Sequence, residues 1–95
     1  MDAVTKTIPA RPDPPPCDAF GQAFRRLRER RGFTAAGLAA ATWVNRYYYH
    51  QWECKPGYPV NRGKLLRTCD FLKASESDRR RLLQLADERL MERTR

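Results

Sequence analysis

The side chains of this chain with the widest chemical repertoire lie between positions 43 and 58, where a histidine, a cysteine and four tyrosines occur. His50 and Cys54 are four residues apart, so they could reach one metal ion from adjacent turns of a helix. A tetrahedral site needs a second pair of ligands, and neither Cys17 nor Cys69 forms a CxxC pair. We therefore expect free thiols, no metal site and no cofactor.

Catalysis finds equally little support in the sequence. The single histidine, His50, has no recognisable arrangement with a Ser or Cys nucleophile, a carboxylate pair or a phosphate-binding loop. We expect that the protein is not an enzyme. What remains at 43–58 is a group of hydrogen-bonding and aromatic side chains suited to binding.

Length and charge indicate the kind of partner. With 95 residues the chain is expected to form one domain with a modest core. Its formal net charge of +8 favours a polyanion, first nucleic acid and then an acidic protein or an anionic membrane surface. No apolar run approaches the roughly 18 residues of a membrane span, and the proline-rich start lacks a secretory pattern. We expect a cytoplasmic protein.

Two short helices joined by a tight corner are predicted between Thr34 and Glu53. The first runs over 35–42 with Thr34 as its cap, and the second over 46–53 with Asn45 as its cap. Leu38 and Ala39 on the first helix are expected to face Val44, Tyr49 and Trp52. The residues then expected to point largely outward are Arg46, Tyr47, Tyr48, His50 and Gln51.

Three further helices complete an all-α prediction with no strand. One runs from an Asp18 cap to Arg31 and stops at Gly32, one covers about 62–73, and the last covers about 75–91. Ser75 and Asp78 have the spacing of a capping box. Residues 1–17, rich in proline, are predicted to be a disordered leader to a domain at 18–95.

The ordered part of the chain resembles the Cro/C1-type (XRE-like) helix-turn-helix family. The resemblance runs from Phe20 to Ala86 and rests on Phe20-Gly21, Phe24 to Arg28, Gly32-Phe33-Thr34, Leu38-Ala39, Trp52-Glu53 and residues 70–86. It implies a five-helix, lambda-repressor-like domain of bacterial or phage type. It also implies double-stranded DNA as partner, a homodimer, and a transcriptional regulator of the nucleoid, more often a repressor.

The outward face of the second central helix then becomes a recognition helix in the major groove. Arginine can bond guanine, glutamine can bond adenine, and tyrosine can contact a thymine methyl. The residues expected to read bases are Arg46, Tyr47 and Gln51. Those expected to contact the DNA backbone are Thr34, Tyr48, His50, Lys55, Tyr58, Arg62 and Lys64.

The corner departs from the family pattern, because Trp43 occupies the position usually held by glycine and Ala35 the position often held by glutamine. Tryptophan must either change the turn or project its ring over the surface. Glu53 is expected to bond a backbone group or an arginine of the first helix. An alternative function is a protein-interaction module, such as an antitoxin or repressor partner, that uses the face of Trp43, Tyr47, Tyr48 and Tyr58.

Overall fold

Each helix of the described chain is preceded by a capping residue, whose side chain accepts a hydrogen bond from a backbone N–H of the first turn. The computed structural model describes residues 14–93, which form five α-helices and no strand. The helices are α2 (Ala19–Arg30), α3 (Ala35–Thr42), α4 (Arg46–Cys54), α5 (Arg62–Phe71) and α6 (Glu76–Arg93). The capping side chains are those of Asp18, Thr34, Asn45, Asn61 and Ser75. The predicted all-α fold with five helices is confirmed.

Three of these helices end in the same way, with a residue in the left-handed conformation. After α2, α3 and α5 this residue is Gly32 (φ 82°), Trp43 (φ 60°) and Lys73 (φ 56°), respectively. In each case the next N–H donates back to a carbonyl five residues earlier, as in a Schellman motif. Glycine is the usual residue there, so Trp43 and Lys73 hold a backbone that is strained for an L-residue. The strained Lys73 also explains why α5 stops at Phe71, before the predicted end.

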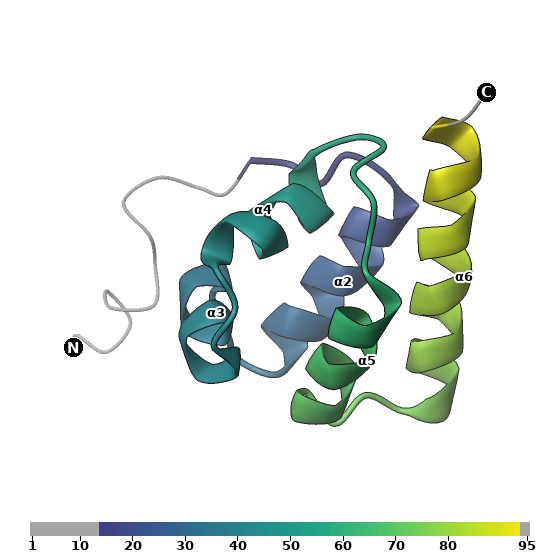
Figure 1. The fold of residues 1–95 in the computed structure, drawn as a ribbon. Helices are drawn as coiled ribbons and strands as arrows, with labels where there is room; N and C mark the ends of the chain where they lie inside the picture. Colours follow the sequence, from purple (N-terminus) through teal and green to yellow (C-terminus); the bar gives the residue numbers. More distant parts are fainter. Residues whose placement is uncertain (1–13, 94–95) are drawn as a thin grey trace.

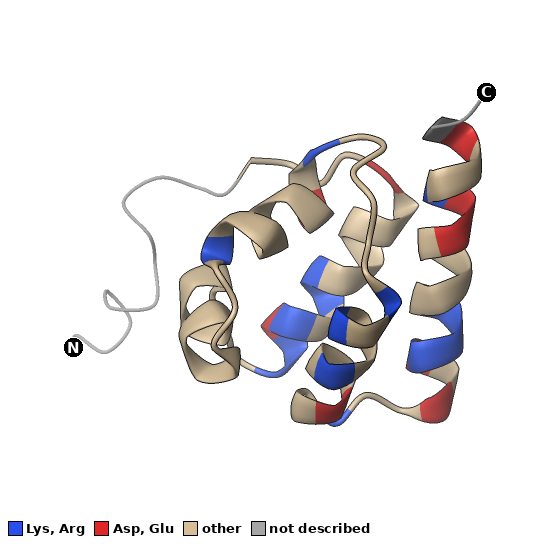
Figure 2. Ribbon diagram, viewed as in Figure 1, with Lys and Arg blue, Asp and Glu red and all other residues tan. Residues whose placement is uncertain are grey.

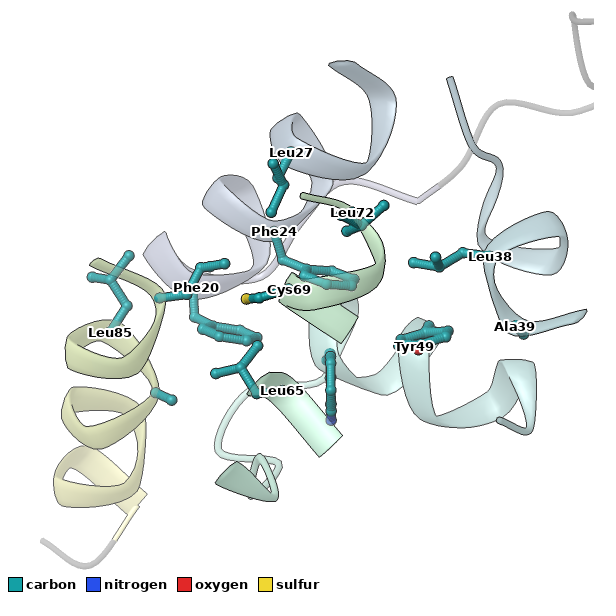
Figure 3. Packing of buried hydrophobic residues seen from close by; sticks show 13 residues of the cluster. Phe20, Phe24, Leu27, Leu38, Ala39, Tyr49, Leu65, Cys69, Leu72 and Leu85 are labelled. Carbon is teal, nitrogen blue, oxygen red and sulfur yellow. The ribbon is translucent and has the colours of Figure 1, made fainter. Parts of the chain in front are cut away.

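The helices enclose one core in which α2 is central. Figure 1 shows α3 and α6 at opposite edges of the molecule, with α2 between them, and α2 packs against both α4 and α6. Figure 3 shows side chains from all five helices converging on this core. Its aromatic centre is made by Phe20, Phe24, Tyr49 and Trp52, whose ring centroids lie 5.2–6.2 Å apart in contacting pairs.

The closest approach between α2 and α4 occurs at Gly21. A Cβ placed on Gly21 would overlap the backbone carbonyl of Glu53. Immediately before α2, Cys17 donates its N–H to that same carbonyl oxygen at 2.8 Å. Residues 14–17, part of the predicted leader, therefore lie against the end of α4, while residues 1–13 lie outside the described residues.

Candidate nucleic-acid interface

Helix α4 is fixed to the rest of the domain by Tyr49 and Trp52, which are fully buried. The Tyr49 hydroxyl lies 2.9 Å from the Thr42 hydroxyl on α3 and 2.9 Å from the Thr68 hydroxyl on α5. One side chain therefore joins three helices by hydrogen bonds in the interior. Val44, partly buried, packs against the same core. The inward face predicted for the two central helices is confirmed.

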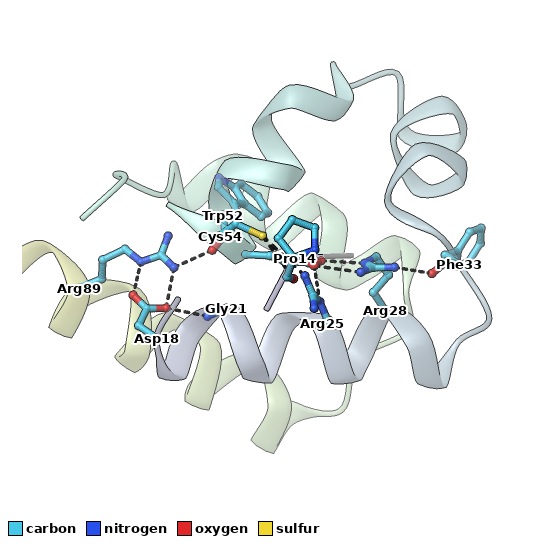
Figure 4. A network of polar contacts seen from close by, with 10 residues as sticks. Pro14, Asp18, Gly21, Arg25, Arg28, Phe33, Trp52, Cys54 and Arg89 are labelled. Carbon is cyan, nitrogen blue, oxygen red and sulfur yellow. Dashed lines mark hydrogen bonds and ion pairs between the residues drawn. The ribbon is translucent and has the colours of Figure 1, made fainter. Parts of the chain in front are cut away.

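A buried carboxylate fixes the C-terminal end of α4, and Figure 4 shows Arg25 and Arg28 of α2, the two arginines that bond it. Glu53 is 2% exposed, and its two oxygens accept from Arg28 at 2.7 and 2.9 Å and from Arg25 at 2.8 Å. Arg28, also 2% exposed, donates in addition to the carbonyl of Phe33. The expectation that Glu53 bonds an arginine of the first helix is confirmed. Arg28 forms part of the interior rather than solvating α2.

A second buried arginine connects α6 to the same end of α4. Arg89 donates to the carbonyl of Trp52 at 2.6 Å and to the carbonyl of Tyr58 at 3.2 Å. It also makes two bonds of 2.7 Å to the carboxylate of Asp18. Burial acts to raise the pKa of Asp18, but hydrogen bonds from Arg89 and Gly21 and the charge of Arg89 bring that pKa below its ordinary value.

With its inner side held in this way, α4 turns its first residues to solvent. Arg46, Tyr47 and His50 are exposed, and Tyr47 is 55% exposed. Asn45, also exposed, accepts the N–H of Tyr47 and so fixes the start of the helix. The structure thus brings two of the three predicted base readers, Arg46 and Tyr47, to one exposed helix start.

Gln51 is the exception, and its predicted outward position is wrong. Its side chain is only 9% exposed, and its amide donates to the Tyr47 hydroxyl at 3.3 Å. Tyr47 and Gln51 are four residues apart and therefore share a face of α4. At Gln51 this face is already buried against the rest of the domain. Gln51 therefore holds the Tyr47 hydroxyl by a hydrogen bond and does not reach the surface itself.

Three tyrosines, Tyr47, Tyr48 and Tyr58, gather beside this exposed start; we refer to them as the tyrosine cluster. The rings of Tyr47 and Tyr48 meet edge to face with centroids 6.1 Å apart, and the Lys64 ammonium lies 4.2 Å from the Tyr48 ring centroid. Burial raises the pKa of Tyr58, and the neighbouring Tyr48 and Tyr47 add to this. Its phenol therefore stays protonated at neutral pH and can donate a hydrogen bond.

The other residues predicted to contact the DNA backbone lie at helix starts and in the loop after α4. Thr34 is exposed and accepts the N–H of Gly37 at the start of α3. Lys55 is exposed directly after α4. Arg62, at the start of α5, is 3.5 Å from the carboxylate of Asp87, in a pair where both side chains are exposed.

The charge of the described chain lies mostly away from α4. Figure 2 shows Lys and Arg over α2, α5 and the first half of α6, whereas α3 carries no charged residue. On α4 the charged positions are Arg46 at its start and the buried Glu53 near its end. The exposed start of α4 is therefore polar and aromatic. Beside it, Lys64 lies over the Tyr48 ring, whereas Lys55 follows the opposite end of α4 and Arg62 begins α5.

The residues that the structure describes can be searched for a metal site, a disulfide and a membrane-spanning helix. Among them, no three His, Cys, Asp or Glu side chains are grouped so that they could hold a metal ion. Cys17, Cys54 and Cys69, all within this part of the chain, form no disulfide with one another. None of the helices described here is both long enough and apolar enough to cross a membrane.

Comparison with protein-family models gives a match over most of the described helices. A family model described as "Helix-turn-helix domain" matches residues 19–82, which covers α2 to α5 and the start of α6. Searches of curated proteins and of solved structures each found no match. The matched segment contains the corner at Trp43 and every residue of the exposed start of α4.

Proposed function

The chain belongs to the helix-turn-helix domain family, and on this premise we propose that it is a sequence-specific DNA-binding transcriptional regulator with α4 as its recognition helix. The observation that supports this most directly is the asymmetry of α4. Its inner side is fixed by Tyr49, Trp52 and Glu53, while Arg46 and Tyr47 are exposed at its start. Recognition helices contact base edges with their N-terminal residues, so this asymmetry fits docking in the major groove.

Base reading is assigned to the exposed start of α4. Arg46 can bond the O6 and N7 atoms of guanine, and Tyr47 can contact a thymine methyl. Gln51 acts indirectly, since its amide bonds the Tyr47 hydroxyl and restricts the ring. This assignment replaces direct adenine recognition by Gln51 with a positioning role.

Backbone contacts position the domain without reading sequence. Lys64 holds its ammonium over the Tyr48 ring, and Lys55 and Tyr58 lie in or beside the loop after α4. The residues proposed to contact phosphates are Thr34, Tyr48, His50, Lys55, Tyr58, Arg62 and Lys64. All of these side chains offer N–H or O–H donors, as phosphate oxygens require.

We propose that two copies bind one site. A single small module buries little DNA surface, and two-fold repetition over half-sites is the usual remedy. Leu90 and Met91 are 45% and 63% exposed on α6 and offer an apolar surface for the second copy. Repression follows most simply, because it requires only that the site be occupied, and the protein would act at the nucleoid in the cytoplasm.

Fluorescence anisotropy tests this function with DNA from upstream of the protein's own gene and a scrambled duplex of equal length. The wild type is expected to bind the upstream duplex at least about two decades more tightly than the scrambled one, since specific complexes typically exceed nonspecific ones by about three to seven decades. Arg46→Ala is expected to reduce that preference by about 1–3 kcal/mol, because this is the discrimination that one bidentate base contact provides. Arg81→Ala, an exposed α6 arginine, is the matched control and should change nothing. Equal binding to both duplexes that disappears at modest salt would contradict the proposal.

A further inference from the structure

The indole of Trp43 serves neither the turn nor the core. It lies in the corner between α3 and α4 and is 94% exposed. Its backbone has φ 60° and ψ 34°, the left-handed conformation that costs an L-residue about 1–2 kcal/mol relative to the right-handed one. Glycine would form the same turn without this cost. A large apolar ring held in the solvent at a strained position indicates a surface that something else covers.

A pocket of about 210 Å³ opens beside the ring, between the corner and α5. Apolar side chains contribute much of its wall, including Val44 from the corner and Phe71 from α5, the latter 42% exposed. Phe71 is held from behind by Phe33, with ring centroids 5.4 Å apart. The residues lining the pocket are Ala41, Thr42, Trp43, Val44, Lys64, Arg67, Thr68 and Phe71.

The two charged residues that line this pocket have the same sign. Lys64 and Arg67 line it, and no acidic residue of the described chain is among the eight lining residues. Lys64 is held in place over the Tyr48 ring, so its charge has a defined position. An apolar hollow with two cations is complementary to a ligand that combines an apolar group with carboxylates.

We propose that this pocket docks an acidic segment of a partner protein. One large apolar side chain of the segment inserts beside Trp43 and Phe71, and flanking carboxylates pair with Lys64 and Arg67. Tryptophan and arginine are enriched among the residues that dominate protein interfaces. A phosphate backbone would satisfy the two cations but offers no projecting apolar group to fill the pocket. This inference goes beyond DNA binding and does not depend on it.

A labelled synthetic peptide with one phenylalanine flanked on both sides by glutamates is the probe, and its anisotropy is the readout. Saturable binding is expected, with affinity at least about tenfold weaker for Trp43→Gly and for Arg67→Glu. Trp43→Gly should fold, because glycine fits the left-handed turn. Arg81→Glu carries the same charge change away from the pocket, at an exposed position of α6, and is expected to bind like the wild type.

Four results would overturn this proposal. The first is no saturable binding of the phenylalanine peptide, and the second is equal binding of a peptide with serine in place of phenylalanine, since charge alone would then suffice. The third is a loss of DNA binding in Trp43→Gly as large as in Arg46→Ala, which would assign the pocket to the DNA interface. The fourth is sedimentation as an oligomer that Trp43→Gly converts to monomer, which would make a second copy the occupant.

Discussion

Glu53 is the residue through which α4 is most strongly held to α2, because its carboxylate pairs with two guanidinium groups, that of the buried Arg28 and that of the partly buried Arg25. Removing one partner of a buried ion pair leaves the other charge in a medium that solvates it poorly. We predict that Glu53→Ala lowers the free energy of unfolding by about 3–5 kcal/mol. Glu53→Gln, which keeps one acceptor oxygen, should lower the free energy of unfolding by less. Urea unfolding followed by circular dichroism measures both.

The matched control is Asp87→Ala, which removes the carboxylate of the exposed pair with Arg62. Exposed ion pairs contribute about 0–1 kcal/mol, so this variant should unfold close to the wild type. If Glu53→Ala and Asp87→Ala unfold at the same urea concentration, the buried ion pair does not hold α4 as we describe.

The pair of Asp18 and Arg89 predicts how stability depends on pH. The pKa of Asp18 is lowered in the folded protein, so the unfolded chain binds more protons when the pH falls between the two values. The stability that Asp18 contributes is therefore present above its unfolded pKa and is lost as the pH falls through its folded pKa. We predict that Asp18→Asn is less stable than the wild type by about 1.5–3 kcal/mol at pH 7.

This substitution isolates the charge, because asparagine caps a helix about as well as aspartate does. Urea unfolding at several pH values between 2 and 7 should show the difference between wild type and Asp18→Asn shrinking toward acid. A difference that stays constant across this range would mean that the charge of Asp18 contributes nothing to folding.

The two buried arginines were predictable in principle from helical spacing. Arg28 lies four residues after Phe24, and Arg89 follows the buried Leu82, Leu85 and Ala86 at the same helical period. Residue type argued against burial, since arginine is rarely buried unless it is paired. The pairing partners, Glu53 and Asp18, are far away in the sequence. The helical period could therefore indicate that the two arginines lie on the buried face, but not which carboxylates would pair with them there.

At the scale of elements, the distance between α2 and α4 is set by one glycine. Gly21 lies where the Glu53 carbonyl passes over α2, and a Cβ there would collide with rigid backbone. We predict that Gly21→Ala destabilises the domain by about 1–3 kcal/mol, the typical penalty for overpacking, although alanine favours helix by about 1 kcal/mol. Thermal unfolding of the purified variant checks this.

Gly63→Ala is the control for helix propensity. Gly63 is exposed in the first turn of α5, and a Cβ there would approach only the side-chain oxygen of Asn61, at 3.3 Å. This variant should unfold within about 1 kcal/mol of the wild type. Equal stability of Gly21→Ala and the wild type would show that α2 and α4 can separate without cost.

Helix positions were the most predictable feature of the molecule. Caps at Asp18, Thr34 and Asn45 predicted the starts of α2, α3 and α4 correctly. Capping involves only residues close together in the sequence, so it can be recognised without knowing the tertiary fold. The end of α3 at Thr42 was also predicted correctly, whereas α5 ends at Phe71, before the predicted end, because Lys73 takes a conformation usually reserved for glycine. The inward position of Gln51 escaped prediction, because it depends on how far the packed face of α4 extends.

At the scale of the whole molecule, the cations are distributed unevenly with respect to the proposed DNA interface. The formal net charge is +8, yet the residues proposed to contact phosphates include only three lysines and arginines, namely Lys55, Arg62 and Lys64. Many of the other arginines lie on α2 and the first half of α6, as Figure 2 shows. A chain that binds through its net charge and one that binds through α4 should therefore differ in salt dependence.

Each phosphate neutralised on duplex DNA contributes about −0.9 to the slope of log K against log salt concentration. Three contacts predict a slope of about −3 per protomer for the specific complex, whereas binding through most of the net charge would be much steeper. Lys55→Ala and Lys64→Ala should each reduce the slope by about 1, and Arg81→Ala on α6 should leave it unchanged. Anisotropy titrations at four or more salt concentrations measure these slopes. A slope that Arg81→Ala reduces as much as Lys64→Ala does would show that DNA lies against α6 and not against α4.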